Sequence, residues 1–115
     1  MCSEKTLLAV DLGTSGMKVA LITVSGNVLA WEVEPINLIL TPDGGVEQNP
    51  EEWWQGFLHA SRRLLSRHLS APEDVIAVCS STQGEGTIPV DQQGNALGNC
   101  ILWMDMRGAS HLHQQ

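Results

Sequence analysis

The stretch Leu7-Leu8-Ala9-Val10-Asp11-Leu12-Gly13-Thr14-Ser15-Gly16-Met17-Lys18 decides how this chain is interpreted. An apolar segment ends beside the carboxylate of Asp11, a turn of two glycines and two hydroxyls follows, and a second apolar segment opens with Lys18. A charge beside buried residues is costly unless it is paired, so Asp11 calls for a metal ion or a hydrogen-bond donor. Glycines let a backbone approach phosphate oxygens and donate N–H groups to them. The stretch therefore predicts a nucleotide-phosphate turn on a β-hairpin, with an ordinary hairpin turn as the alternative.

Two better-known phosphate motifs do not fit. A P-loop requires G-x-x-x-x-G-K-[ST] between a strand and a helix. Here Gly13 and Gly16 are three positions apart, and residues 19–24 are rich in β-branched side chains that favour a strand. The only G-x-G is at residues 84–86, where Pro89 soon prevents the helix that a dinucleotide site needs.

Composition sets mild bounds on function. A chain of 115 residues with 43% hydrophobic content suits one domain with a core. A net charge of -7 argues against nucleic acid and anionic membranes as partners. Cys2, Cys79 and Cys100 are odd in number and lack C-x-x-C spacing, so neither a disulfide framework nor a zinc site is expected. With no signal peptide or membrane-length apolar run, we expect a cytoplasmic protein.

Three strands are predicted first, at Thr6–Leu12, Met17–Val24 and Val28–Glu34. Because the turns between them are short, these strands should be antiparallel neighbours. Prolines and glycines then predict a loop over residues 35–45.

A helix is predicted to begin after Asn49. Asn49 can serve as the N-cap, Pro50 suits the first helical position, and Asn49 with Glu52 has the spacing of a capping box. Apolar residues at helical spacing continue to about Leu69. A buried strand over residues 75–79 should then lie parallel to the first strand, as a helical crossover requires.

The rest of the chain is polar and rich in glycine. Two further short strands are predicted at Thr87–Val90 and Cys100–Trp103, and a helix should begin between Asp105 and Gln115. The fold class is therefore α/β.

Four segments in this order carry a resemblance to a known family: Asp11–Lys18, Val46–Trp54, Ser81–Gly86 and Ile101–Arg107. Together they resemble the amino-terminal part of the FGGY carbohydrate kinases, xylulokinase-like or glycerol-kinase-like, in the superfamily of actin, heat-shock chaperones and hexokinases. The resemblance implies an actin-like ATPase (ribonuclease H-like) fold, with three antiparallel strands followed by a helix and a parallel strand. Residues 1–115 would be an incomplete amino-terminal lobe.

The resemblance also implies phosphoryl transfer from ATP to a sugar or polyol hydroxyl, with Mg²⁺. Asp11 would hold the hydrated metal ion. The amides and hydroxyls of Gly13, Thr14 and Ser15 would meet the β- and γ-phosphates, and Lys18 would steady the transferring group. Such positioning and charge stabilisation is what phosphoryl transfer needs.

Gln83, Glu85 and Asp105 would line the sugar pocket, where a carboxylate can accept hydrogen bonds from adjacent hydroxyls. The two carboxylates also have plainer interpretations: Glu85 as a solvated loop charge and Asp105 as a helix cap, with Arg107 on the surface. Lys18 could likewise be an exposed strand residue.

Trp53 and Trp54 could form a sugar-stacking platform, but their helical context favours core packing for both.

The substrate stays open at this point. Gly84-Glu85 stands where xylulokinase-like members have Met-His and glycerol-kinase-like members have Arg-Glu. In the family the catalytic base lies in a later glycine-rich segment, so it is expected beyond Gln115, and no catalytic residue is assigned here. We therefore expect no kinase turnover from this chain alone, and a homodimer formed through an exposed sheet edge. The competing hypotheses are an actin-like or chaperone-like ATP-binding module and a non-catalytic interaction domain.

Overall fold

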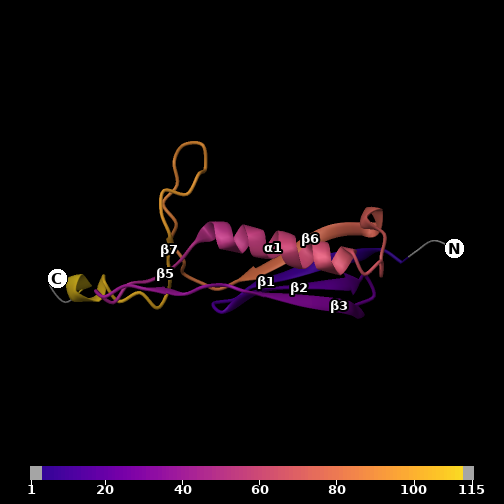
Figure 1. The fold of residues 1–115 in the computed structure, drawn as a ribbon, viewed down its shortest axis with the longest axis horizontal. Coiled ribbons are helices and arrows are strands. Elements are labelled where there is room, and N and C mark those ends of the chain that lie inside the picture. The colour runs from indigo at the N-terminus through magenta and orange to yellow at the C-terminus, as the bar shows by residue number, and fades with distance from the viewer. Residues whose placement is uncertain (1–3, 113–115) are drawn as a thin grey trace.

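A computed structural model describes residues 4–112, and its body is a four-stranded sheet with one long helix on one face (Figure 1). The strands are β1 (Thr6–Leu12), β2 (Gly16–Thr23), β3 (Val28–Pro35) and β6 (Val75–Thr82), in the order β3-β2-β1-β6. β1 and β3 run antiparallel to β2, and β6 runs parallel to β1. The predicted mixed sheet is confirmed. Of the predicted domain, residues 1–3 and 113–115 lie outside the described part.

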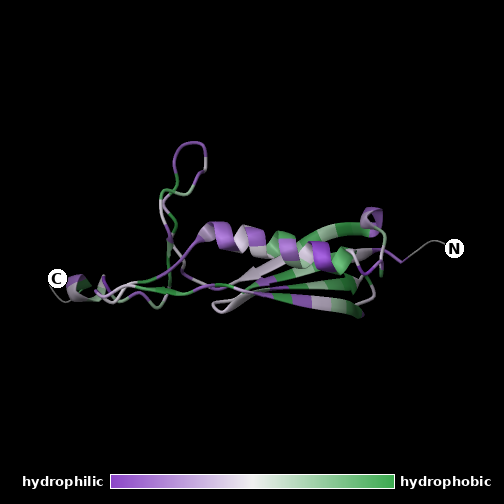
Figure 2. Ribbon diagram, in the orientation of Figure 1, coloured by the Kyte–Doolittle hydropathy of each residue, from purple (hydrophilic) through white to green (hydrophobic). Residues whose placement is uncertain are grey.

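The core lies between this sheet and helix α1 (Pro50–Leu65). Side chains alternate along β1 and β2, so every second residue faces the helix. The buried apolar residues are Leu8, Val10, Met17, Val19, Leu21, Ala30, Ile36, Ala60 and Leu64. Figure 2 shows the same contrast, with apolar strands beneath a helix of mixed polarity.

The predicted N-cap of α1 is confirmed, because Asn49 Oδ1 accepts the N–H of Glu51 at 3.0 Å. The prediction of a capping box between Asn49 and Glu52 is wrong. The Glu52 carboxylate instead accepts the backbone N–H of Asn37 at 3.1 Å, which ties the helix to the segment after β3. The helix also ends at Leu65 rather than near Leu69. It cannot continue because His68 adopts a positive φ of 53°, outside the helical region.

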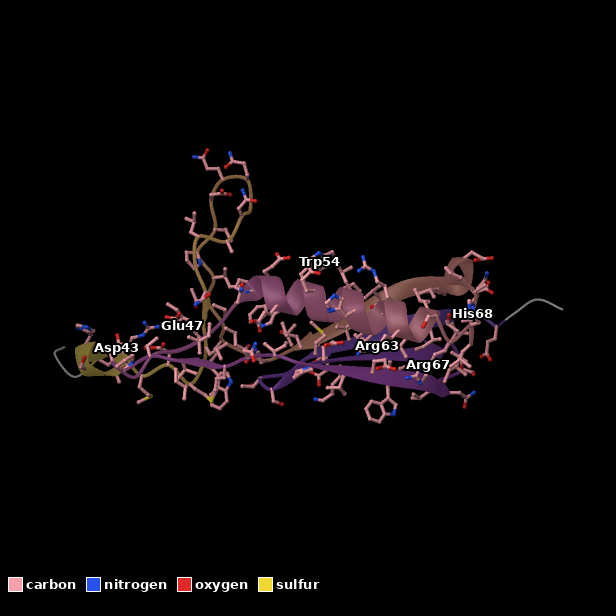
Figure 3. All side chains as sticks on the ribbon, in the orientation of Figure 1. Asp43, Glu47, Trp54, Arg63, Arg67 and His68 are labelled. Carbon is pink, nitrogen blue, oxygen red and sulfur yellow. The ribbon has the colours of Figure 1, made fainter. Side chains whose placement is uncertain are left out.

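Arg63 of α1, and Arg67 in the turn just after it, form ion pairs with Glu32 and Glu34 of β3. These pairs hold the C-terminal end of the helix against one edge of the sheet. Figure 3 labels Arg63 on α1 and Arg67 just beyond its end, both on the side that faces β3.

β6 differs from its prediction in length and in burial. It runs to Thr82 rather than Cys79, and it is largely exposed, with Ile76 at 59% and Val78 at 57%. The reason is its position at the edge of the sheet: within residues 4–112, β1 is its only partner strand. A 3-10 turn, η1 (Pro72–Asp74), leads into it.

A second, smaller sheet was not predicted in full. Its strands are β4 (Ile39–Leu40), β5 (Val46–Gln48) and β7 (Cys100–Ile101), in the order β4-β5-β7 and all antiparallel. Residues 35–45, predicted as a loop, therefore carry a strand that pairs back on β5.

Two predicted short strands are mostly absent from the described part of the chain. Thr87–Val90 contributes only isolated bridges, Thr87 with Ile101 and Val90 with Ala96, and the second strand stops at Ile101. Residues 87–99 project from the body as an arm (Figure 1). The expected final helix is the single turn α2 (Ala109–Leu112).

Candidate functional site

The site is built where two parallel strands end together. Leu12 closes β1 and Thr82 closes β6, and the two residues are register partners. The N–H of Gln83 donates to the carbonyl of Leu12 at 2.7 Å, so both chains leave the sheet side by side. Ligands of α/β sheets bind beyond the carboxyl ends of the strands. The turns after β1 and β6 are therefore placed to share one ligand site.

The turn after β1 presents two unused amide groups. Gly13 donates its N–H to the carbonyl of Gly16 at 3.0 Å, which closes the hairpin. Within residues 4–112, the amides of Thr14 and Ser15 have no protein acceptor. A Cβ on Gly16 would lie 2.9 Å from the carbonyl oxygen of Glu34, so only glycine allows this close approach of β3. The turn can therefore donate two N–H groups to an anion.

Asp11 and Lys18 face each other across the hairpin. They are register partners, and the Lys18 ammonium lies 3.0 Å from Asp11 Oδ2. Lys18 Nζ is also 3.6 Å from where a Cβ on Gly13 would be, which places the cation beside the turn. Both side chains are about half exposed and so accessible to a ligand.

Asp11 is suited to a metal ion that is held mainly by water and phosphate. No group of three or more His, Cys, Asp or Glu side chains in the described part of the chain could enclose a metal. Mg²⁺ commonly binds through one or two carboxylates, waters and substrate phosphates, and a single accessible carboxylate meets that requirement.

A shallow pocket lies next to the turn. It has a volume of about 410 Å³ and is lined by Thr14, Gln83, Gly84, Glu85 and Trp103. Thr14 Oγ1 donates to Gln83 Oε1 at 3.2 Å and accepts from Trp103 Nε1 at 3.4 Å. The structure thus brings together the predicted phosphate and sugar residues Thr14, Gln83 and Glu85, and it adds Trp103. The sequence placed Trp103 in a family segment without assigning it a role.

Gln48 is the second residue that sequence reasoning missed. Its side chain is fully buried at the end of β5. Its Nε2 donates to the carbonyl of Thr14 at 2.6 Å, and its Oε1 accepts from Gln83 Nε2 at 2.9 Å and Trp53 Nε1 at 3.2 Å. Only its place inside a family segment, beside Asn49 and Pro50, could have drawn attention to it.

Asp105 does not line this pocket. Its carboxylate accepts the N–H of Val46 at 2.9 Å and Arg107 Nη2 at 2.7 Å. Hydrogen bonds from Arg107, then from Val46, hold the pKa of Asp105 well below its usual range. The same ion pairs raise the pKa of Arg107 above its ordinary value. Arg107, interpreted from the sequence as a surface residue, is partly exposed and has a further role, because its guanidinium also binds Glu47 at 2.7 Å.

Glu47, labelled in Figure 3, lies on β5, where it is paired with Ile39 of β4 on one side and Ile101 of β7 on the other. Hydrogen bonds from Asn99, and secondly from Arg107, lower the pKa of its carboxyl. The Asp105–Arg107–Glu47 cluster thus joins β5 to the segment that follows β7.

The two tryptophans of α1 have different environments. Trp53 packs against the core and donates to Gln48. Trp54 is 55% exposed, so its predicted core packing is wrong. It stacks near Phe57, with ring centroids 5.6 Å apart, on the wall of an apolar groove between α1 and β6. Figure 3 shows Trp54 on the outer side of the helix.

The sequence matches one protein family over almost its whole length. The family is described as the FGGY family of carbohydrate kinases, N-terminal domain, and the match covers residues 6–114. This match favours a carbohydrate kinase over the actin-like, chaperone-like and non-catalytic alternatives.

Curated and solved proteins agree with the family match. The xylulose kinase of Bacillus subtilis is 36% identical over 103 residues, which are 90% of this chain and 21% of that protein. The gluconate kinase of Lactobacillus acidophilus has a TM-score of 0.87 at 23% identity, covering 97% of this chain and 22% of that one. The glycerol kinase of Plasmodium falciparum, solved with ADP, has a TM-score of 0.82 at 19% identity, covering 96% and 22%. The two structures show the same fold, and the chain spans about a fifth of each relative's length.

Proposed function

The chain belongs to the FGGY family of carbohydrate kinases, and from this premise we propose that it supplies the phosphate-binding part of an enzyme that transfers the γ-phosphoryl group of ATP to a sugar or polyol. One observation carries the proposal. The turn at residues 13–15 and the pocket around Gln83 lie at the same end of the sheet and are joined by one direct hydrogen bond and by two that pass through Gln48. A phosphate donor and a hydroxyl acceptor bound there would meet, and such positioning is the main requirement of phosphoryl transfer.

The donor side of the site consists of the hairpin residues. The amides of Thr14 and Ser15 would donate to phosphate oxygens, with Gly13 providing the tight turn. Lys18 would move its ammonium from Asp11 toward the γ-phosphate and offset the charge that develops on its oxygens.

Mg²⁺, when bound, would neutralise phosphate charge, and Asp11 is the residue that would hold it through water. Asp11 also orients Lys18, since the two side chains are 3.0 Å apart.

The acceptor side consists of Gln83 and Glu85. Glu85 has a positive φ of 57° and is exposed at the pocket, so its carboxylate is available to hydroxyl groups. The resemblance also implies Asp105 for this side, and that stays a prediction. In the structure its carboxylate is bound by Val46 and Arg107.

The catalytic base is proposed to come from the part of the kinase that this chain does not include, beyond Gln115. A base must come within hydrogen-bonding distance of the acceptor hydroxyl. We therefore propose that the isolated chain transfers no phosphoryl group.

The setting of the proposed reaction is the cytoplasm, where ATP is available and thiols stay reduced. Among the described residues Cys79 and Cys100 are free, and none of the helices is long and apolar enough to cross a membrane. We propose neither nucleic acid nor membrane as a partner, since the net charge is -7. We also propose a homodimer formed through the exposed edge of β6.

The test uses the full kinase polypeptide that carries this segment, assayed for ADP release from MgATP with xylulose, gluconate or glycerol. The expected result is acceptor-dependent ADP release with at least one of the three, and none from the isolated 115-residue chain. ADP release that ignores every polyol and sugar offered would contradict the proposal.

A further inference from the structure

Gln48 lies where three separate parts of the site meet. It is the last residue of β5, the middle strand of the small sheet, and its side chain has no exposure to solvent. An amide of this size is buried without cost only when its polar atoms are hydrogen-bonded. Its partners are therefore what keep this residue in place.

Those partners are the two sides of the proposed site. Through Nε2 it holds the backbone carbonyl of Thr14, in the phosphate turn, at 2.6 Å. Through Oε1 it accepts from Gln83, on the acceptor side, at 2.9 Å. A third bond, from Trp53 at 3.2 Å, anchors the amide to α1.

The bonds close a ring. Thr14 Oγ1 donates to Gln83 Oε1 at 3.2 Å, so Thr14, Gln83 and Gln48 are each bonded to the other two. Thr14 and Gln83 are 69 positions apart in the sequence. Gln48 is fully buried and its two partners are partly buried, so the three hydrogen bonds strengthen one another and link the positions of the three residues.

We propose that Gln48 is a positioning residue that couples occupancy of the acceptor pocket to the geometry of the phosphate turn. When an acceptor hydroxyl orders Gln83, the Gln48 amide transmits that order to the carbonyl of Thr14 and so to the amides that meet the phosphates. The inference rests on the proposed function, since it assigns the two ends of the ring to donor and acceptor. It predicts that acceptor and nucleotide bind with positive coupling, and that Gln48 carries it.

The decisive variant is Gln48→Glu in the full polypeptide. A carboxylate still accepts hydrogen bonds from Gln83 and Trp53 but cannot donate to Thr14. The variant therefore removes only the hydrogen bond to the phosphate turn. Gln48→Met removes all the polar bonds with little change in volume, and it serves as the second variant if the buried charge prevents folding. Trp53→Phe is the matched control, because it removes one donor to the same oxygen on the side facing α1.

The measurement is the affinity for MgADP by calorimetry, with and without the acceptor that the unmodified enzyme phosphorylates. In the unmodified enzyme, the acceptor should tighten MgADP binding by a factor in the usual range of roughly 5 to 150. In Gln48→Glu and Gln48→Met this factor should fall toward 1. In Trp53→Phe the thermal midpoint should fall while the coupling factor is retained, and exposed Gln92→Glu should change neither.

Two outcomes overturn different statements. If Gln48→Glu and Trp53→Phe lose stability alike and both keep the coupling factor, Gln48 is a structural amide and the inference is wrong. If the unmodified enzyme phosphorylates none of the acceptors, the proposed function itself fails, and the inference fails with it.

Discussion

Asp105 accepts the backbone N–H of Val46 at 2.9 Å, and this bond holds the end of the described chain against β5. The Arg107 guanidinium lies 2.7 Å from Asp105 Oδ2 and 2.7 Å from Glu47 Oε1, so two carboxylates share one cation. Because Trp103 precedes this cluster and Gln48 adjoins it on β5, the cluster supports both residues that sequence reasoning missed.

The stability of the protein should fall in acid, and Asp105 should account for part of the fall. The folded-state pKa of Asp105 lies below its ordinary value, so the unfolded chain takes up a proton first as the pH drops. The contribution of Asp105 to stability is therefore fully present above about pH 4, the ordinary pKa of Asp, and is lost as the pH falls from there toward the folded-state pKa. Urea unfolding of the wild type and of Asp105→Asn across this range measures the effect.

The slope of stability against pH should be smaller in Asp105→Asn, by up to about one proton. Glu85→Gln is the control, since the Glu85 carboxylate is exposed and has no partner among the described residues. Equal slopes for wild type and Asp105→Asn would show that the Arg107 contact does not persist in solution.

Arg107→Lys should lower the thermal midpoint despite conserving the charge. A lysine ammonium cannot reproduce the planar fork that contacts Asp105 through Nε and Nη2 while also reaching Glu47. Arg62→Lys on the exposed face of α1 is the control and should leave the midpoint unchanged. If both variants have the same thermal midpoint as the wild type, the guanidinium geometry has no importance for stability.

Leu64→Ala should destabilise the fold by about 2–5 kcal/mol, the usual cost of removing a buried leucine side chain. Leu64 is fully buried between α1 and the sheet. Leu97→Ala on the projecting arm, where the side chain is exposed, should change stability by less than about 0.5 kcal/mol. Denaturant titration followed by circular dichroism compares them, and similar losses would contradict the assigned core.

Asp11→Asn in the full kinase should lower kcat by about 10²-fold or more, the size expected when one preorganised charge is removed from a phosphoryl-transfer site. If Asp11 acts on the transferring group, the loss should appear in kcat, whereas a role in binding ATP alone would raise the KM for ATP and leave kcat unchanged. Asp91→Asn on the arm is the control, because the hydrogen bonds of Asp91 within the described part of the chain go to Gln93, Gly94 and Asn95, all in its own loop. Steady-state kinetics measures the effect. A kcat within twofold of wild type would show that Asp11 has no role on the donor side of the site.

Ile76→Lys should weaken self-association of the 115-residue chain. β6 is an edge strand, and Ile76 is 59% exposed on it, so a lysine there would place charge in any strand-to-strand contact. Sedimentation equilibrium over a wide concentration range should show a dimer for the wild type and a monomer for the variant. Val90→Lys, equally exposed but on the arm, should still dimerise. A monomeric wild type would end the proposal of a dimer through β6.

Much of the fold could be predicted because its signals are local. The alternation of side chains in residues 6–35 and the cap at Asn49 each depend on residues a few positions apart. The first three strands and the start of the helix therefore appeared where they were expected. The exposure of β6 was missed because burial depends on what lies beyond a strand, and apolar residues at an edge look like those of a central strand. The hairpin of β4 and β5 was missed because Pro42 and the glycines at 44 and 45 dominate that stretch.

The sequence by itself predicted a phosphate turn, from Asp11 to Lys18, and identified the family to which the chain belongs. Both depend on residue types at short spacing, which is what a sequence displays. Only the tertiary structure decided that Gln48 joins Thr14 to Gln83 and that Asp105 binds Val46 and Arg107. Hydrogen bonds between residues dozens of positions apart exist only after strands and turns have been brought together, and no local pattern records them.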